Sequence, residues 1–166
     1  IAMRKWRGLI PLMVLIVIVY IILPHHKNIT MQLQAVQYSQ NSPSSYKDVN
    51  LSITGRYTKR IGHNDRFTGE ISIQGYDFLN DKHVNIIVDD DVGCLLQYVQ
   101  LENGELNSID FGYIYSSPNF ARFVIMVFSP SASKSDSKTW SKANGTIICF
   151  PANDLSEAKQ ISKLFI

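Results

Sequence analysis

The stretch Leu101-Glu102-Asn103-Gly104-Glu105-Leu106 decides the fold, because it joins two strand-like runs through a two-residue turn. Asn-Gly suits a type I′ turn, in which both central residues take positive φ and the twist matches that of two paired strands. The runs on either side, Cys94 to Glu102 and Glu105 to Tyr115, are therefore predicted to form an antiparallel hairpin.

Other short runs of β-branched or alternating apolar and polar residues lie on both sides of this hairpin, separated by turn residues. The further strands that we predict are Ile29–Ala35, Val49–Tyr57, Phe67–Ile73, His83–Val88, Phe120–Phe128 and Thr146–Phe150. Phe120–Phe128 is apolar at most positions and is expected to be covered on both faces. No strand–helix–strand alternation occurs, so the sheet should be antiparallel.

The C-terminal segment has a helix signature. Asp154 is suited to be an N-cap, Glu157 follows three residues later, and Leu155, Ala158 and Ile161 recur at helical spacing. The predicted fold is mainly β: an antiparallel sandwich or a rolled, barrel-like sheet of about eight strands, with a C-terminal amphipathic helix from about residue 154. The Ser- and Lys-rich stretch Ser129–Gly145 is predicted to be a long loop.

The segment from Gly8 to Leu23 is apolar all round and contains no charged residue. As a helix it would rise about 24 Å, somewhat less than the ~30 Å hydrocarbon core of a bilayer, with Trp6 and Tyr20 suited to the interfaces. No Ala-x-Ala-like cleavage pattern follows it, which favours an uncleaved transmembrane signal anchor over a signal peptide. We therefore expect a short N-terminus at 1–7, an anchor at 8–24 and a β-rich domain at 25–166.

The charges around this segment predict its direction. Arg4, Lys5 and Arg7 precede it and only Lys27 follows closely, so the positive-inside rule places the N-terminus in the cytoplasm and the domain outside the cell membrane. The chain has 16 basic and 14 acidic residues and a net charge of +2, so without those three basic residues the domain carries −1. A near-neutral domain argues against a nucleic-acid partner.

Two stretches carry a resemblance to a known group of proteins. Phe67-Thr68-Gly69-Glu70-Ile71-Ser72-Ile73 is one, and Ile147-Ile148-Cys149-Phe150-Pro151-Ala152-Asn153-Asp154-Leu155-Ser156-Glu157-Ala158 is the other. Together with the N-terminal anchor, they resemble small, uncharacterised, membrane-anchored proteins of Bacillus-like Firmicutes. The resemblance implies a Gram-positive cell envelope and brings no activity with it.

Two basic clusters are candidates for contact with an anionic surface, either lipid headgroups or a phosphate-rich wall polymer. They consist of Arg56, Lys59, Arg60 and Arg66, and of Lys134, Lys138 and Lys142 with Trp140. The competing interpretation is that both are solvated loops whose charges keep the domain soluble.

Residues that could carry chemistry are sparse. Cys94 and Cys149 allow a disulfide in an exported domain, or two buried free thiols. The acidic run Asp89–Asp91 lacks the alternation of an EF-hand loop and is interpreted as a solvated turn rather than a calcium site. No catalytic, cofactor or metal motif is recognised, because the nucleophile-elbow, phosphate-loop and dinucleotide patterns are all absent.

The leading functional hypothesis is a non-enzymatic, membrane-tethered extracytoplasmic binding or accessory module of the cell envelope, whose partner is a protein or an envelope polymer. One alternative is a carrier of a small apolar ligand in a barrel-like cavity. The other is a hydrolase whose site is assembled from residues distant in the sequence.

Overall fold

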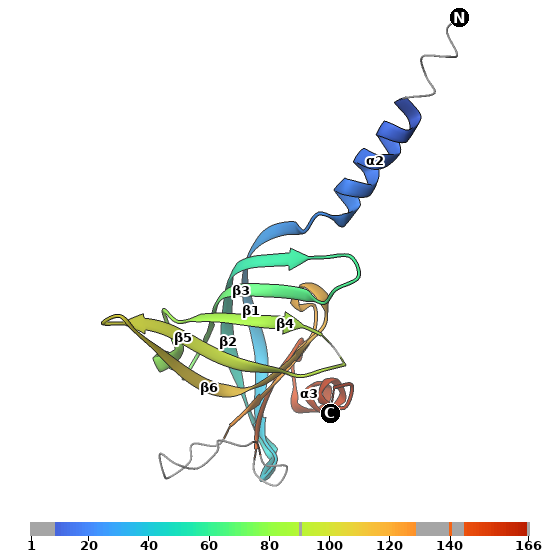
Figure 1. Cartoon of the computed structure of the whole chain (residues 1–166). Helices are drawn as coiled ribbons and strands as arrows, with labels where there is room; N and C mark the ends of the chain where they lie inside the picture. The colour runs from blue at the N-terminus through green and yellow to red at the C-terminus, as the bar shows by residue number, and fades with distance from the viewer. Residues whose placement is uncertain (1–8, 90, 129–139, 141–144, 166) are drawn as a thin grey trace, which may run out of the picture.

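The computed structural model describes residues 9–89, 91–128, 140 and 145–165. Its strands form one closed antiparallel barrel, in which each strand pairs with its neighbours in sequence and β8 returns to β1 (Figure 1). The strands are β1 (His25–Ser39), β2 (Ser42–Lys59), β3 (Asp65–Ile73), β4 (His83–Val88), β5 (Cys94–Glu102), β6 (Glu105–Ser116), β7 (Phe123–Val127) and β8 (Thr146–Phe150). Of the two architectures left open by the sequence, the rolled sheet is the one that forms.

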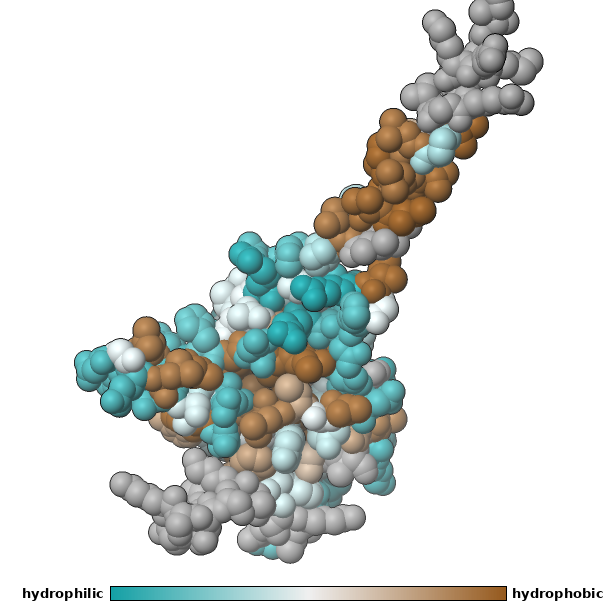
Figure 2. All heavy atoms as spheres, in the orientation of Figure 1, coloured by the Kyte–Doolittle hydropathy of each residue, from teal (hydrophilic) through white to brown (hydrophobic). Residues whose placement is uncertain are grey.

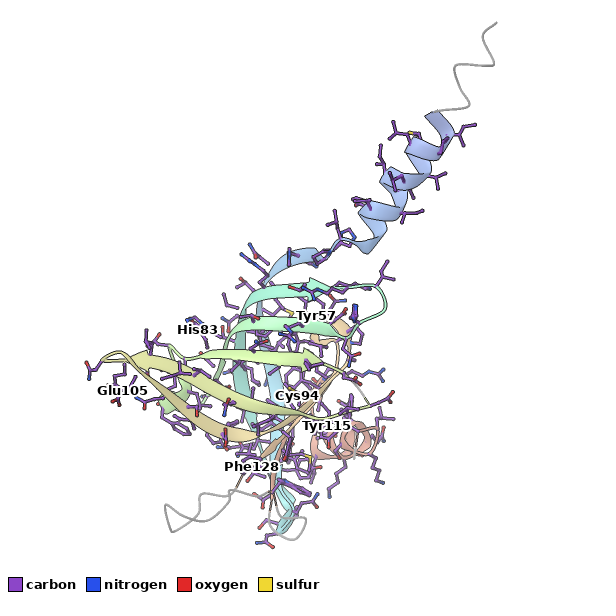
Figure 3. The ribbon with its side chains drawn as sticks, in the orientation of Figure 1. Tyr57, His83, Cys94, Glu105, Tyr115 and Phe128 are labelled. Atoms are coloured by element: carbon purple, nitrogen blue, oxygen red, sulfur yellow. The ribbon has the colours of Figure 1, made fainter. Side chains whose placement is uncertain are left out.

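The predicted Asn-Gly hairpin is confirmed. Glu102 pairs with Glu105, and the two residues between them have positive φ angles of 53° at Asn103 and 84° at Gly104, as a type I′ turn requires. β7 pairs with β6 only from Gly112 onward, so the distal part of the β5–β6 hairpin projects beyond the barrel as a two-stranded arm (Figures 1 and 3).

The interior is filled by the inward-facing side chains of the strands, together with Leu79 and Phe120 from connecting segments. The largest interior side chains, Phe67, Tyr98 and Phe120, are at most 1% exposed. The Tyr98 hydroxyl donates a 2.8 Å hydrogen bond to the Ile71 carbonyl, which satisfies the polar tip of this buried ring.

A second cluster lies outside the barrel wall, under α3 (Leu155–Ser162). Asp154 caps this helix by accepting a 2.9 Å hydrogen bond from the Glu157 N–H, as predicted. The Tyr38 hydroxyl donates to Ser162 Oγ at 2.9 Å and ties the helix to β1. Because α3 covers the outer face of β7, all five residues of β7 are buried, which confirms the expectation of a strand covered on both faces.

Several predicted boundaries are wrong. β1 runs from His25 to Ser39 rather than from Ile29 to Ala35. β2 begins at Ser42 rather than at Val49, because Ser39 pairs with Ser42 and a tight hairpin satisfies the backbone of these polar residues. Phe120 is not in β7, because Pro118–Phe120 forms the 3-10 turn η2, with positive φ at Asn119. The Phe120 ring nevertheless enters the interior, edge-on to Phe67 at a centroid distance of 5.1 Å.

The predicted transmembrane segment contains the helix α2 (Leu9–Ile22), which has 14 residues and leads almost directly into β1. It projects away from the barrel, and most of its visible surface is apolar (Figures 1 and 2). α2 ends before Pro24, because the residue preceding a proline disfavours helical geometry. In the described part of the chain, no helix combines the length and the apolar character that crossing a membrane would need.

Candidate functional site

A row of four side chains crosses the outer face of the sheet, at the end of the barrel nearest α2. Register pairs His26 with Thr58, Thr58 with Arg66, and Arg66 with Ile87, so the row spans β1 to β4. Neighbours along each strand, such as Tyr57 and Phe67, face the interior, so alternation turns the members of the row outward.

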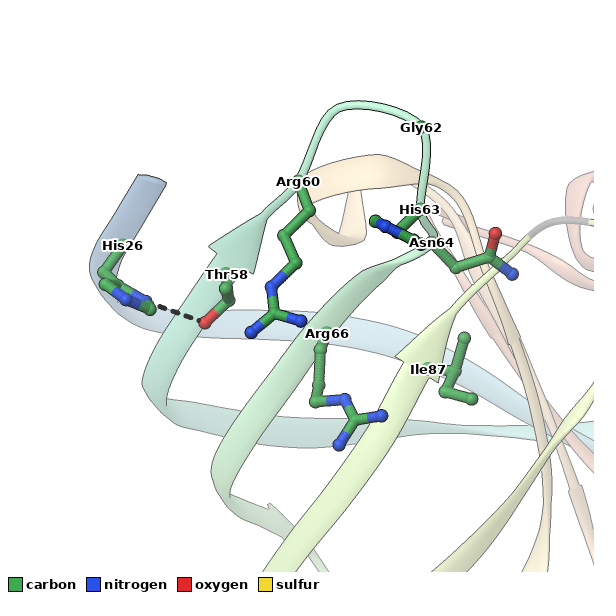
Figure 4. A pocket seen from close by; sticks show the side chains of 8 residues that line it. All are labelled: His26, Thr58, Arg60, Gly62, His63, Asn64, Arg66 and Ile87. Atoms are coloured by element: carbon green, nitrogen blue, oxygen red, sulfur yellow. Dashed lines mark hydrogen bonds between the residues drawn. The ribbon is translucent and has the colours of Figure 1, made fainter. Parts of the chain in front are cut away.

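The loop between β2 and β3, the two middle strands of this row, completes a pocket of about 540 Å³. The pocket is lined by His26, Thr58, Arg60, Gly62, His63, Asn64, Arg66 and Ile87 (Figure 4). Its polar groups are two guanidinium groups, which only donate hydrogen bonds, and two imidazoles, one amide and one hydroxyl, which can donate and accept them.

Hydrogen bonds fix the walls of the pocket. His26 Nδ1 and Thr58 Oγ1 share a hydrogen bond of 3.0 Å across the strands (Figure 4). On the other side, Asn64 Nδ2 donates to Asp89 Oδ2 at 2.6 Å and holds the β2–β3 loop against the end of β4. The loop is therefore positioned by the fold rather than by a ligand.

The electrostatic character of the pocket is positive. The lining residues include no carboxylate. His83 forms an ion pair with Glu70, whereas neither Arg60 nor Arg66 has a carboxylate partner among the described residues. Asp89 is close by, but its other oxygen, Oδ1, accepts hydrogen bonds from the N–H groups of Asp91 and Val92 at 2.9 and 3.2 Å. Its carboxylate thus serves as a cap of the β4–β5 turn.

The predicted basic residues separate in the structure. Arg60 and Arg66 line the pocket, whereas Arg56 lies one row further along the sheet, between Asn28 and Thr68. Lys59 pairs with His25 at the end of β2. Neither Arg56 nor Lys59 lines the pocket.

The second predicted cluster falls mostly outside the described residues, where Lys134, Lys138 and Lys142 and most of the loop Ser129–Gly145 lie. Trp140 is described, and the surface contact predicted for it stays a prediction. Its ring packs against the outer cluster under α3, and its indole nitrogen is buried.

Cys94 and Cys149 are free thiols, so the disulfide that the sequence allowed does not form. Cys94 packs against the interior cluster and Cys149 belongs to the outer cluster, so the barrel wall separates the two sulfur atoms. Burial raises the pKa of the Cys149 thiol to about 12.

The end of the barrel under the pocket is closed by a hydrogen-bonded tyrosine. The Tyr57 hydroxyl donates to Asp65 Oδ2 at 2.7 Å and accepts a 3.0 Å hydrogen bond from the N–H of Asn119. Burial raises the pKa of Tyr57, and the nearby Asp65 contributes in the same direction. No local sequence pattern predicts this contact, because Tyr57 and Asn119 lie 62 residues apart in the chain.

The barrel is compatible with the carrier alternative at the level of fold. Its interior, however, is occupied by the packed aromatic and aliphatic cluster. Two further depressions, of about 270 Å³ beside the tip of the β1–β2 hairpin and about 450 Å³ between α3 and Arg122, also lie on the outside. Among the described residues, no group of three or more His, Cys, Asp or Glu side chains is placed to hold a metal ion.

Comparisons with known proteins found no matching protein-family model, no matching curated protein and no matching solved structure. The resemblance to membrane-anchored Firmicute proteins therefore stays a prediction.

Proposed function

We propose that this protein is a membrane-tethered extracytoplasmic binding module of the cell envelope, held by the apolar segment that contains α2. The observation that carries the proposal is the exposure of α2: its apolar side chains from Ile10 to Tyr20 are between 46% and 66% exposed. Apolar surface of this extent marks a membrane or partner contact. A helix that is apolar all round, without a polar stripe, fits lipid better than a one-sided protein groove.

α2 is shorter than the hydrocarbon core that it would have to cross. Fourteen residues rise about 21 Å, against the ~30 Å of a typical hydrocarbon core. A short span is accommodated by local thinning of the bilayer and by flanking side chains that reach the interface. Tyr20 is suited to that role, because its ring lies edge-on to His25 at 5.2 Å, where the helix gives way to the barrel. The basic residues Arg4, Lys5 and Arg7 support a cytoplasmic N-terminus.

Binding is favoured over catalysis and over transport of an apolar ligand. The pocket presents donors and positive charge, and its lining includes no serine, cysteine or carboxylate to act beside its two histidines. An apolar ligand inside the barrel would have to displace rings such as Phe67 and Tyr98, which are fully packed.

Membrane fractionation tests the proposal. The wild-type chain should stay with membranes through a high-salt wash, and external protease should reach the barrel in intact cells stripped of their wall. The double variant Leu15→Lys, Ile18→Lys should move to the soluble fraction, because each charge near the centre of a span costs about 3 kcal/mol.

Leu101→Lys is the matched control, since Leu101 is 72% exposed at the tip of the β5–β6 arm and lies far from α2. It should remain with the membrane. Wild-type protein in the soluble fraction, or release of the control together with the double variant, would refute the anchor.

A further inference from the structure

Arg60, directly after the end of β2, and Arg66, on β3, approach the same space from the two sides of the β2–β3 connection (Figure 4). Two guanidinium groups without a carboxylate partner repel each other at close range. An anion bound between them would remove this repulsion, so the pocket favours a negatively charged ligand. The planar fork of a guanidinium matches the oxygens of a phosphate group and can donate two hydrogen bonds to it.

The rest of the lining fits a phosphate that is attached to carbon. His63 stands on the loop above the arginines and adds a further donor, while Ile87, 44% exposed, provides an apolar wall beside Arg66. His26, held by Thr58, closes the side nearest α2. A phosphate ester presents anionic oxygens on one side and carbon on the other. The arginines and His63 can donate to the oxygens, and Ile87 can contact the carbon.

The location of the pocket indicates where such a group would come from. His26 follows the last residue of α2, Ile22, by four positions, so an extended chain separates the two Cα atoms by at most about 14 Å. If α2 lies in the hydrocarbon, the pocket is within reach of the headgroup layer of the same leaflet. Free phosphate in solution would gain nothing from this position.

We propose that this outer pocket binds the phosphate group of an anionic phospholipid headgroup, through Arg60 and Arg66. The choice of the lipid as the source rests on the proposed membrane anchor, whereas the affinity for a phosphate ester rests on the pocket alone. Engagement of a headgroup would orient the barrel against the membrane surface with its β2–β3 loop toward the lipid.

The test uses the full chain in nanodiscs, with isoleucine methyl groups labelled for NMR. Ile87 is the reporter because it lines the pocket, and Ile53, which is 1% exposed in the interior, reports that the barrel stays folded. Phosphatidylcholine discs are titrated with soluble glycerol 3-phosphate in one arm. In the other arm, the discs contain an increasing fraction of phosphatidylglycerol.

The Ile87 methyl signal should shift as phosphatidylglycerol is added, with the Ile53 signal unchanged. Arg60→Gln and Arg66→Gln should each weaken this response at least tenfold, because each removes a charge-assisted pair of hydrogen bonds. Lys82→Gln, which removes the same charge at the turn before β4, on the opposite end of that strand, should respond like wild type.

Shifts in both arms that are lost in the arginine variants support a phosphate site, and saturation at lower concentration in the lipid arm identifies the headgroup as its source. A response to glycerol 3-phosphate without one to phosphatidylglycerol overturns the assignment to lipid. No shift at Ile87 in either arm, or an equal loss in Lys82→Gln, overturns the site itself. All variants should remain embedded in the discs. Loss of binding in the pocket is therefore distinguishable from failure of the proposed anchor, because without the anchor the chain would not enter the discs.

Discussion

Replacing Gly55 by alanine should destabilise the barrel, although alanine usually suits a strand better than glycine. Gly55 on β2 pairs with Gly69 on β3, and both face the interior next to the Phe67 ring. A Cβ atom added at Gly55 would lie 2.5 Å from the Thr68 carbonyl oxygen, 2.7 Å from Gly69 Cα and 2.9 Å from Phe67 Cζ.

Two of these neighbours are backbone atoms, so rotation of a side chain cannot relieve the contact. The strands would have to separate by about 1 Å to restore ordinary van der Waals distances. Overpacking of this kind costs about 1–3 kcal/mol, and each stretched ladder hydrogen bond adds about 1 kcal/mol. Against a gain of about 0.5–1 kcal/mol from the loss of glycine flexibility, we expect a net loss of about 2–3 kcal/mol.

The assay is thermal unfolding followed by circular dichroism, with the full chain in detergent. A domain of this size should lose roughly 5–10 °C in Tm. Thr54→Ala is the control, because Thr54 is exposed on the same strand, and it should stay within about 1 kcal/mol of wild type. A Gly55→Ala chain that melts at or above the wild-type temperature would refute the reasoning. Full recovery in the double variant Gly55→Ala, Phe67→Leu would show that the ring, not the strand approach, sets the limit.

Three other predictions concern hydrogen bonds and a buried thiol. Tyr57→Phe should lower the free energy of unfolding, measured by urea titration, by about 2 kcal/mol. The reason is that the Asp65 carboxylate and the Asn119 N–H each lose their hydrogen bond to the tyrosine hydroxyl. A loss below about 0.5 kcal/mol would contradict this. Asp154→Ala should cost about 1 kcal/mol through loss of the α3 cap, with Asp154→Asn close to wild type. The pKa of the Cys149 thiol is about 12 in the folded chain and about 9 in the unfolded chain. The unfolded chain therefore loses this proton first as the pH rises, so the free energy of unfolding should fall above pH 9, by roughly 1 kcal/mol at pH 10. Cys149→Ala should remove that part of the slope, and an unchanged slope would count against the buried thiol.

Features with a local cause could be predicted from the sequence. The Asn103-Gly104 turn follows from backbone geometry, because both residues accept positive φ, and the cap at Asp154 needs only the first turn of its own helix. Strand alternation also predicted which residues face the core, such as Ile53 and Ile71, since the period of a strand is two wherever it pairs. Arg60 and Arg66 were candidates from their proximity in the chain alone.

The tertiary structure decided what depends on register and closure. The barrel closes because β8 pairs with β1 from Val36↔Cys149 onward, a contact across more than a hundred residues that no local pattern encodes. The pocket joins His26, Arg66 and Ile87 only because four strands hold one register, and a slip of one residue would turn a member of the row into the core. The sequence by itself determined the strands, the turn, the helix cap and the apolar segment, each from interactions within a few residues. Long-range strand pairing decided which of the basic side chains share a pocket. It also decided on which side of the barrel wall each thiol lies.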